Sequence, residues 1–207
     1  MSAGFIITNV SNGLIDLDRQ HDAYRVKCVD MLHHWVPALR RLLRPRTKIL
    51  IQLLFGNNAT HVARMAYENA DALAQQMVQL ATTHDWIAGY VLDYEADCGY
   101  GCDPGHDHGV QNLTECMHSR LSCETQEAGL LATFMATLST ALHAKGKSLS
   151  FAVSGPRGAG FEHWPYYGRY LKAGVDRLYE MGESSSAALL SCAMLLTGNA
   201  LSLQELT

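Results

Sequence analysis

Apolar residues follow two alternating patterns along this chain, short continuous runs and longer repeats spaced by three or four residues. Short runs bounded by turn-forming residues are typical of buried strands, whereas the longer repeats are typical of helices with one apolar face. The runs predict strands at residues 5–8, 48–55, 86–95, 148–154 and 175–181. The repeats predict helices at residues 28–43, 62–83, 130–142 and 166–173.

Strands that alternate with helices predict an α/β fold with a parallel sheet. Two architectures fit this order, an open doubly wound sheet and part of a (β/α)8 barrel. A complete barrel takes about 250 residues, whereas this chain has 207 and only five clear strand patterns. No linker divides the chain, so we expect a single domain over residues 1–207. Residues 96–124, which are rich in Cys, Gly and His, show no periodicity and are expected to form a long loop insertion.

The composition is that of a folded protein with no strong charge bias. Apolar residues make up 48%, charged residues 17%, and the net charge is −4. Such a chain buries enough apolar surface to fold, which excludes intrinsic disorder. The one arginine-rich segment, residues 40–46, lies at a predicted helix end, where cations complement the helix dipole. We therefore expect no nucleic-acid partner.

The sequence shows no membrane or targeting segment. No apolar run is long enough for a transmembrane helix, and residues 1–12 lack the features of a signal peptide.

The strand at residues 86–95 carries the sharpest chemical feature, two carboxylates at its carboxyl end. Side chains alternate between the faces of a strand, so one face is expected to hold Gly89, Val91, Asp93 and Glu95, and the other Ala88, Tyr90, Leu92 and Tyr94. Parallel α/β folds place their active sites at the carboxyl ends of the strands. Two neighbouring acids raise the pKa of one of them, which keeps a carboxyl protonated for general acid catalysis.

Residues 89–95, Gly-Tyr-Val-Leu-Asp-Tyr-Glu, resemble the signature strand of glycoside hydrolase family 18, the chitinase-like (β/α)8 barrels. The family pattern is Asp-Gly-x-Asp-x-Asp-x-Glu. The resemblance implies substrate-assisted, retaining cleavage of β-linked N-acetylglucosamine glycans of the chitin or chito-oligosaccharide type, with no cofactor or metal. Glu95 would be the acid/base that protonates the glycosidic oxygen. Asp93 would orient the substrate's N-acetyl group, whose carbonyl oxygen is the nucleophile.

The resemblance extends more weakly over residues 5–183. Residues 48–56, 148–154 and 174–181 are similar to the third, fifth and sixth strands of the family's barrel, so the chain would hold about strands two to six. It implies a glycan substrate and substrate-binding roles for Tyr94, Met181, Glu183 and Trp164. An incomplete barrel exposes strand edges, so we expect self-association through them.

Two signature acids of the family are replaced in this chain, by Ala88 and Val91. In addition, Gly182 and Glu183 follow Met181 where the family usually has a Tyr and an Asp. The alternative function is therefore a catalytically weak or inactive chitinase-like protein that binds carbohydrate.

Cysteines and histidines gather after the acidic strand, at Cys98, Cys102, His106, His108, Cys116 and Cys123. Two disulfides, a zinc site and free thiols all fit this spacing, and four cysteines allow three disulfide connectivities. A metal-dependent or structural protein built on this segment is thus a third functional class. Acceptor patterns for glycosylation at Asn9, Asn58 and Asn112 favour an oxidising, secretory location. Cys28 and Cys192 are expected to be buried as small apolar residues.

Overall fold

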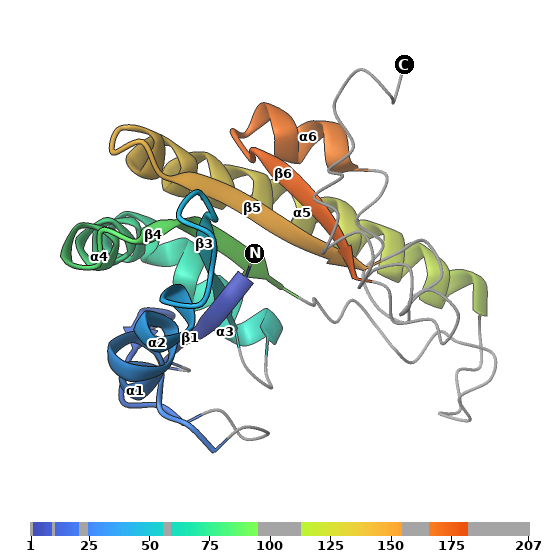
Figure 1. Ribbon diagram of the computed structural model, residues 1–207. Coiled ribbons are helices and arrows are strands. Elements are labelled where there is room, and N and C mark those ends of the chain that lie inside the picture. The colour runs from blue at the N-terminus through green and yellow to red at the C-terminus, as the bar shows by residue number, and fades with distance from the viewer. Residues whose placement is uncertain are drawn as a thin grey trace, which may run out of the picture.

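A computed structural model describes residues 2–9, 11–20, 25–55, 59–94, 113–154 and 166–181. Strands and helices alternate along these residues, as the apolar patterns predict (Figure 1). The strands are β1 (Ser2–Thr8), β2 (Ile15–Asp16), β3 (Ile49–Leu54), β4 (Ile87–Asp93), β5 (Ser148–Ser154) and β6 (Arg177–Met181). The helices are α1 (Cys28–Asp30), the π-helical turn η1 (Met31–Trp35), α2 (Val36–Arg40), α3 (Ala59–Glu68), α4 (Ala70–Thr83), α5 (Leu113–His143) and α6 (Tyr167–Lys172).

The sheet settles which α/β architecture the chain adopts. Its strand order is β2-β1-β3-β4-β5-β6, in which β1, β3, β4, β5 and β6 run parallel and only β2 is antiparallel. A doubly wound sheet reverses its strand order at a switch point and carries helices on both faces. Here the parallel strands follow one another in chain order, as they do in a barrel. The fold is therefore an incomplete (β/α)8-type barrel, as expected.

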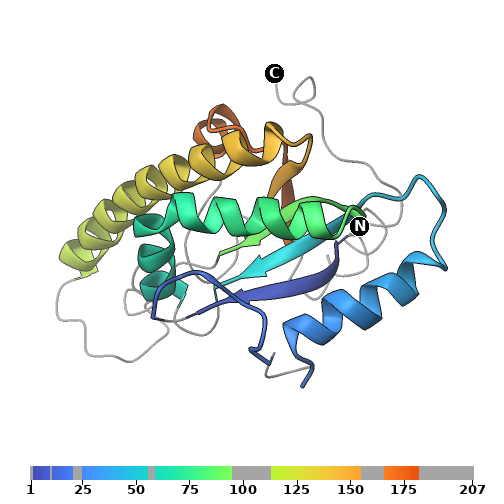
Figure 2. The ribbon, with the colours of Figure 1, turned by 90° about the vertical axis from the view of Figure 1, so that its left-hand side faces the viewer.

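The helices pack on one face of the sheet, so most of the core lies between them and the strands (Figures 1 and 2). Alternate residues of β3, Ile49, Ile51 and Leu53, point into this core and are almost completely buried. The first helical segment adds Cys28, Leu32 and Val36, which confirms the expectation for Cys28. The opposite face, which would line the inside of a barrel, carries a smaller apolar cluster of Leu50, Val91 and Ala152.

One predicted helix is divided in the structure, and one short strand was not predicted. The helix expected at residues 62–83 is two helices, α3 and α4, because the chain bends at Asn69. The Asn69 side-chain amide donates to the carbonyl oxygens of Met65 (2.9 Å) and Asn12 (3.1 Å), so it links the bend to the segment before β2. The short strand β2, which pairs with β1 next to this bend, was not predicted.

The loop expected at residues 96–124 is wrong in its last part, since α5 begins at Leu113. Once a helix is nucleated and packed, each further residue adds a hydrogen bond at little cost, so α5 extends beyond its periodic apolar segment.

The position of α5 also bears on the cysteines. Cys116 and Cys123 both lie in α5, seven positions apart, so their Cα atoms are separated by about 10.5 Å. A disulfide needs Cα atoms within about 7 Å. The structure thus removes one of the three connectivities, the one that pairs Cys116 with Cys123; Cys98 and Cys102 lie outside the described residues.

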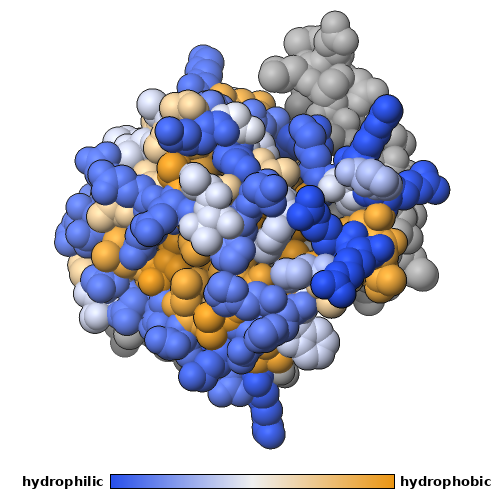
Figure 3. Space-filling model, turned by 60° about the vertical axis from the view of Figure 1, so that its left-hand side comes forward, coloured by the Kyte–Doolittle hydropathy of each residue, from blue (hydrophilic) through white to orange (hydrophobic). Residues whose placement is uncertain are grey.

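The helical side of the molecule carries a mostly hydrophilic surface. Seen from the side of α1, α2 and α4, polar side chains surround smaller apolar areas (Figure 3). Trp35 and Leu42 are the most exposed large apolar side chains of the described residues, at 61% and 83%. None of the described helices is both long and apolar enough to cross a membrane.

Candidate active site

Polar and apolar side chains form layers on the inner face of the sheet. Strand register places Leu54, Asp93, Ala152 and Tyr179 side by side near the carboxyl ends of β3 to β6. The layer below consists of Gln52, Val91, Ser150 and Arg177. Asp93 therefore lies at the end of the sheet where parallel α/β folds build their active sites.

Asp93 is held by a residue from the neighbouring strand. The side-chain amide of Gln52 donates a hydrogen bond of 2.5 Å to Oδ2 of Asp93. Gln52 lies one layer lower than Asp93, so its side chain runs diagonally up the inner face. Asp93 is partly buried, and an acceptor carboxylate in such a place needs donors to replace lost water. Gln52 supplies one.

A β-bulge at the start of β4 corrects the expected orientation of Ala88. Ile49 pairs with Ile87, but the next residue, Leu50, pairs with Gly89, so β4 contains one extra residue at this point. A bulge shifts the alternation of side chains by one. Ala88 consequently packs against the inner apolar cluster rather than under the helices. Both positions that lack a family 18 acid, 88 and 91, therefore carry apolar side chains on the inner face.

Tyr94, the residue after Asp93, is fully buried under the helices. Its hydroxyl donates to Oε1 of Glu127 on α5 at 2.6 Å, and the hydroxyl of Tyr67 donates to the same oxygen at 2.8 Å. Burial, followed by the neighbouring Tyr94 and Glu127, raises the pKa of Tyr67 well above its usual value, so this phenol stays a donor. The contact ties the carboxyl end of β4 to α5.

The structure does not bring Tyr94 to the inner face beside Asp93, and a substrate contact for Tyr94 stays a prediction. The backbone of Met181 ends β6 and pairs with Ser154. Glu95, Glu183 and Trp164 lie outside the described residues, as does the side chain of Met181. Their roles, like that of Asp93, remain predictions.

Three polar residues near this site were not predicted from the sequence. Gln52 interrupts an otherwise apolar run, and that polar residue in a buried strand was the available signal. Tyr179 lies two residues before Met181 and so shares its face by alternation. Glu127 lies just before the predicted start of its helix, and nothing in the sequence indicated that it would be buried.

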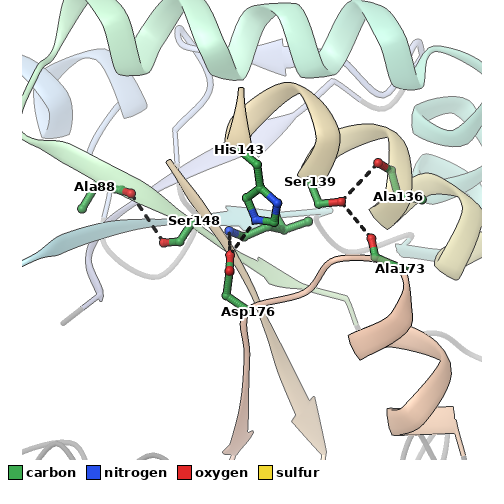
Figure 4. A network of polar contacts seen from close by, with 8 residues as sticks. Ala88, Ala136, Ser139, His143, Ser148, Ala173 and Asp176 are labelled. Carbon is green, nitrogen blue, oxygen red and sulfur yellow. Dashed lines mark hydrogen bonds and ion pairs between the residues drawn. The ribbon is translucent and has the colours of Figure 1, made fainter. Parts of the chain in front are cut away.

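A second polar cluster lies at the opposite, amino end of the strands (Figure 4). Oδ2 of Asp176 accepts from the backbone N–H of Leu149 at 2.8 Å and contacts Nε2 of His143 at 3.0 Å. The hydroxyl of Ser139 contacts the carbonyl oxygens of Ala136 and Ala173. Because Ser139 bonds to backbone and not to His143, the three residues do not form a hydrolytic triad. They fasten α5 and the start of β6 to the start of β5, at the end of the barrel associated with stability.

No family model and no curated protein matches the sequence of this chain. Solved structures do match its fold. A chitinase from Chromobacterium violaceum superposes with a TM-score of 0.55 and 17% identity, over 89% of this chain and 48% of that one. Catalytic domain 2 of the Group II chitinase from Ostrinia furnacalis gives 0.54 and 17%, over 86% and 42%.

The Group IV chitinase from Ostrinia furnacalis, solved in complex with allosamidin, gives a TM-score of 0.53 with 14% identity, over 86% of this chain and 42% of that one. This chain thus spans about half the length of the structures that it matches. At such low identity the likeness concerns the fold. The described part of this chain has the fold of about half of a chitinase-type (β/α)8 barrel, which confirms at the level of the fold the resemblance seen in its acidic strand.

Proposed function

We propose that this chain belongs to a glycosidase that cleaves β-linked N-acetylglucosamine glycans of the chitin or chito-oligosaccharide type. One observation carries the proposal: Asp93 lies on the inner face of a chitinase-type sheet, at the carboxyl end of the strand whose sequence resembles the family 18 signature. The allosamidin complex of the Ostrinia furnacalis Group IV chitinase supports a glycan ligand.

The proposed chemistry divides the work between two carboxyl groups and the substrate itself. Glu95 donates its proton to the glycosidic oxygen as the bond to the anomeric carbon breaks. The carbonyl oxygen of the substrate's N-acetyl group attacks that carbon, and Asp93 holds the acetamido N–H so that this oxygen points correctly. Water then attacks the same carbon while Glu95 takes back a proton. General acid–base catalysis of this kind contributes roughly 10²- to 10⁴-fold to a rate.

A second function, carbohydrate binding without turnover, is favoured by one observation. Ala88 and Val91 make the inner face apolar below Asp93, where the family carries two further acids. An aspartate without these neighbours still accepts a hydrogen bond from an amide, so binding of an N-acetyl group would survive a loss of catalysis.

Hydrolysis of a fluorogenic N-acetylchito-oligosaccharide tests both functions, with calorimetric binding of the unlabelled sugar measured in parallel. We expect turnover by the wild-type chain and a loss of at least about a hundredfold in Glu95→Gln and Asp93→Asn. Glu68→Gln is the matched control, because Glu68 is an exposed carboxylate on α3. Binding without turnover in every form would favour the carbohydrate-binding function. A folded chain that neither binds nor cleaves the sugar would overturn both.

Secretion is a companion proposal that rests on the three glycosylation patterns. Expression in a secretory eukaryotic host should give a mass shift that an endoglycosidase removes. An unmodified chain in the medium would contradict the glycosylation.

A further inference from the structure

Gln52 donates a side-chain hydrogen bond to Asp93, and its position in the sheet is unusual. It lies in the middle of β3, between Ile51 and Leu53, which are both fully buried under the helices. Its own side chain points to the other face, next to Val91 in the register. A polar side chain here gains nothing from apolar packing, so its hydrogen bond to Asp93 is the interaction that explains it.

The chemistry of this contact is directional. The amide nitrogen of Gln52 faces Oδ2 of Asp93, since the amide oxygen would repel a carboxylate. The side chain directly below Asp93 on its own strand, Val91, has no polar atom to offer. Gln52 therefore draws the Asp93 carboxylate down the inner face, toward β3 and away from the open end of the sheet.

We infer that Gln52 is a positioning residue, whose carboxamide sets the resting orientation of the Asp93 carboxylate in a chain that carries a valine at position 91. This inference rests on the proposed function for its consequence in catalysis. When a substrate's acetamido group arrives, Asp93 exchanges the neutral amide of Gln52 for the acetamido N–H. A neutral donor holds the carboxylate firmly enough to order it, yet releases it without separating an ion pair.

Two substitutions of Gln52 distinguish the effect of its hydrogen-bond donor from the effect of its side-chain shape. Gln52→Leu removes the amide, and Gln52→Glu keeps length and shape but replaces the donor with a second carboxylate that repels Asp93. The matched control is Gln76, another partly buried glutamine, which accepts a hydrogen bond of 2.9 Å from the backbone N–H of Ile15 and lies on α4. Gln76→Leu and Gln76→Glu change the same atoms far from Asp93.

Steady-state hydrolysis of the fluorogenic N-acetylchito-oligosaccharide gives the first readout. Both Gln52 variants should lose about ten- to a hundredfold in kcat, because a reacting group misplaced by about 1 Å costs up to a hundredfold, while KM stays within about threefold. The Gln76 variants should keep the wild-type kcat. Equal losses in the Gln52 and Gln76 variants, or a kcat unchanged in Gln52→Glu, would overturn the positioning role.

Urea unfolding of Gln52→Leu, Asp93→Asn and the double variant gives a readout that needs no catalysis. A hydrogen bond to a carboxylate predicts that the two changes are coupled by about tenfold or more in the unfolding equilibrium constant. Additive effects would overturn the inference whatever the activity. If the two substitutions are strongly coupled in unfolding but the chain shows no turnover, the proposed glycosidase function is overturned. The positioning of Asp93 by Gln52 would then still stand.

Discussion

The buried contact between Tyr94 and Glu127 supports a quantitative prediction about how the acidic strand is anchored. Tyr94→Phe removes a single hydroxyl and keeps the ring, whose edge-on contact with Phe55 has a centroid distance of 5.4 Å. The lost bond is the 2.6 Å donation to Oε1 of Glu127, which then keeps the 2.8 Å bond from Tyr67. The substitution thus removes the hydroxyl that donates to Glu127 and changes the packing very little.

The expected cost follows from the type of acceptor. A hydrogen bond to a charged group contributes about 1.5–3 kcal/mol net, and one between neutral groups about 0.5–1.5 kcal/mol. Tyr90→Phe is a natural control. Tyr90 lies on β4, which ends just before Tyr94, and it is equally buried. It donates at 2.6 Å to a neutral acceptor, the carbonyl oxygen of Met77. Tyr94→Phe should therefore destabilise the chain by about 1–2 kcal/mol more than Tyr90→Phe.

Urea denaturation followed by tryptophan fluorescence gives both free energies, provided the slope with denaturant is the same in all forms. For a chain of this size, the loss for Tyr94→Phe corresponds to a fall in Tm of roughly 3–12 °C. In a Glu127→Gln background, the difference between the two tyrosine variants should shrink by about 1 kcal/mol, since the carboxylate is gone. A cost for Tyr94→Phe no larger than that for Tyr90→Phe would refute the reasoning.

Three further predictions concern the stability of the sheet and its helices. Gly89→Ala should cost about 1–3 kcal/mol or more by urea unfolding, because an added Cβ would lie 2.2 Å from the carbonyl oxygen of Ser148; a neutral result would contradict the close approach. Asp176→Ala should lower stability by about 1–3 kcal/mol, since it removes the acceptor of a backbone N–H in β5, and an unchanged Tm would count against that contact. Burial, and then the neighbouring His33, lowers the pKa of His84 below 6.5, so the folded state binds this proton at a lower pH than the unfolded state does. The free energy of unfolding should therefore be constant above about pH 7 and decrease as the pH drops below 6.5. His84→Gln should reduce this decrease.

The sequence predicted the parallel α/β fold well because buried strands and amphipathic helices each impose a period on the apolar residues. Strand β5 was predicted with its observed ends. The choice between a doubly wound sheet and an incomplete barrel needed the strand order, which depends on contacts between segments far apart in the chain. The bulge at Ala88 was not predicted for a similar reason, since it arises from the pairing of β4 with β3.

The candidate site was predictable where its motif is local and unpredictable where it is assembled from different strands. Asp93 and Glu95 could be proposed from the sequence because they are two residues apart in one predicted strand. The partner of Asp93, Gln52, lies 41 residues earlier in the chain. Glu127, the partner of Tyr94, lies 33 residues later. The residues near the acidic strand do not indicate either partner.

The most direct test of the proposed function is the anomeric form of the first product, followed by proton NMR during hydrolysis of a β-linked N-acetylchito-oligosaccharide. Attack by the substrate's own acetamido group on the anomeric carbon, followed by attack of water, inverts that carbon twice. The account predicts that the β anomer forms first from the wild-type chain and that Glu95→Gln releases no product. An α anomer formed first, or equal product from Glu95→Gln, would contradict it.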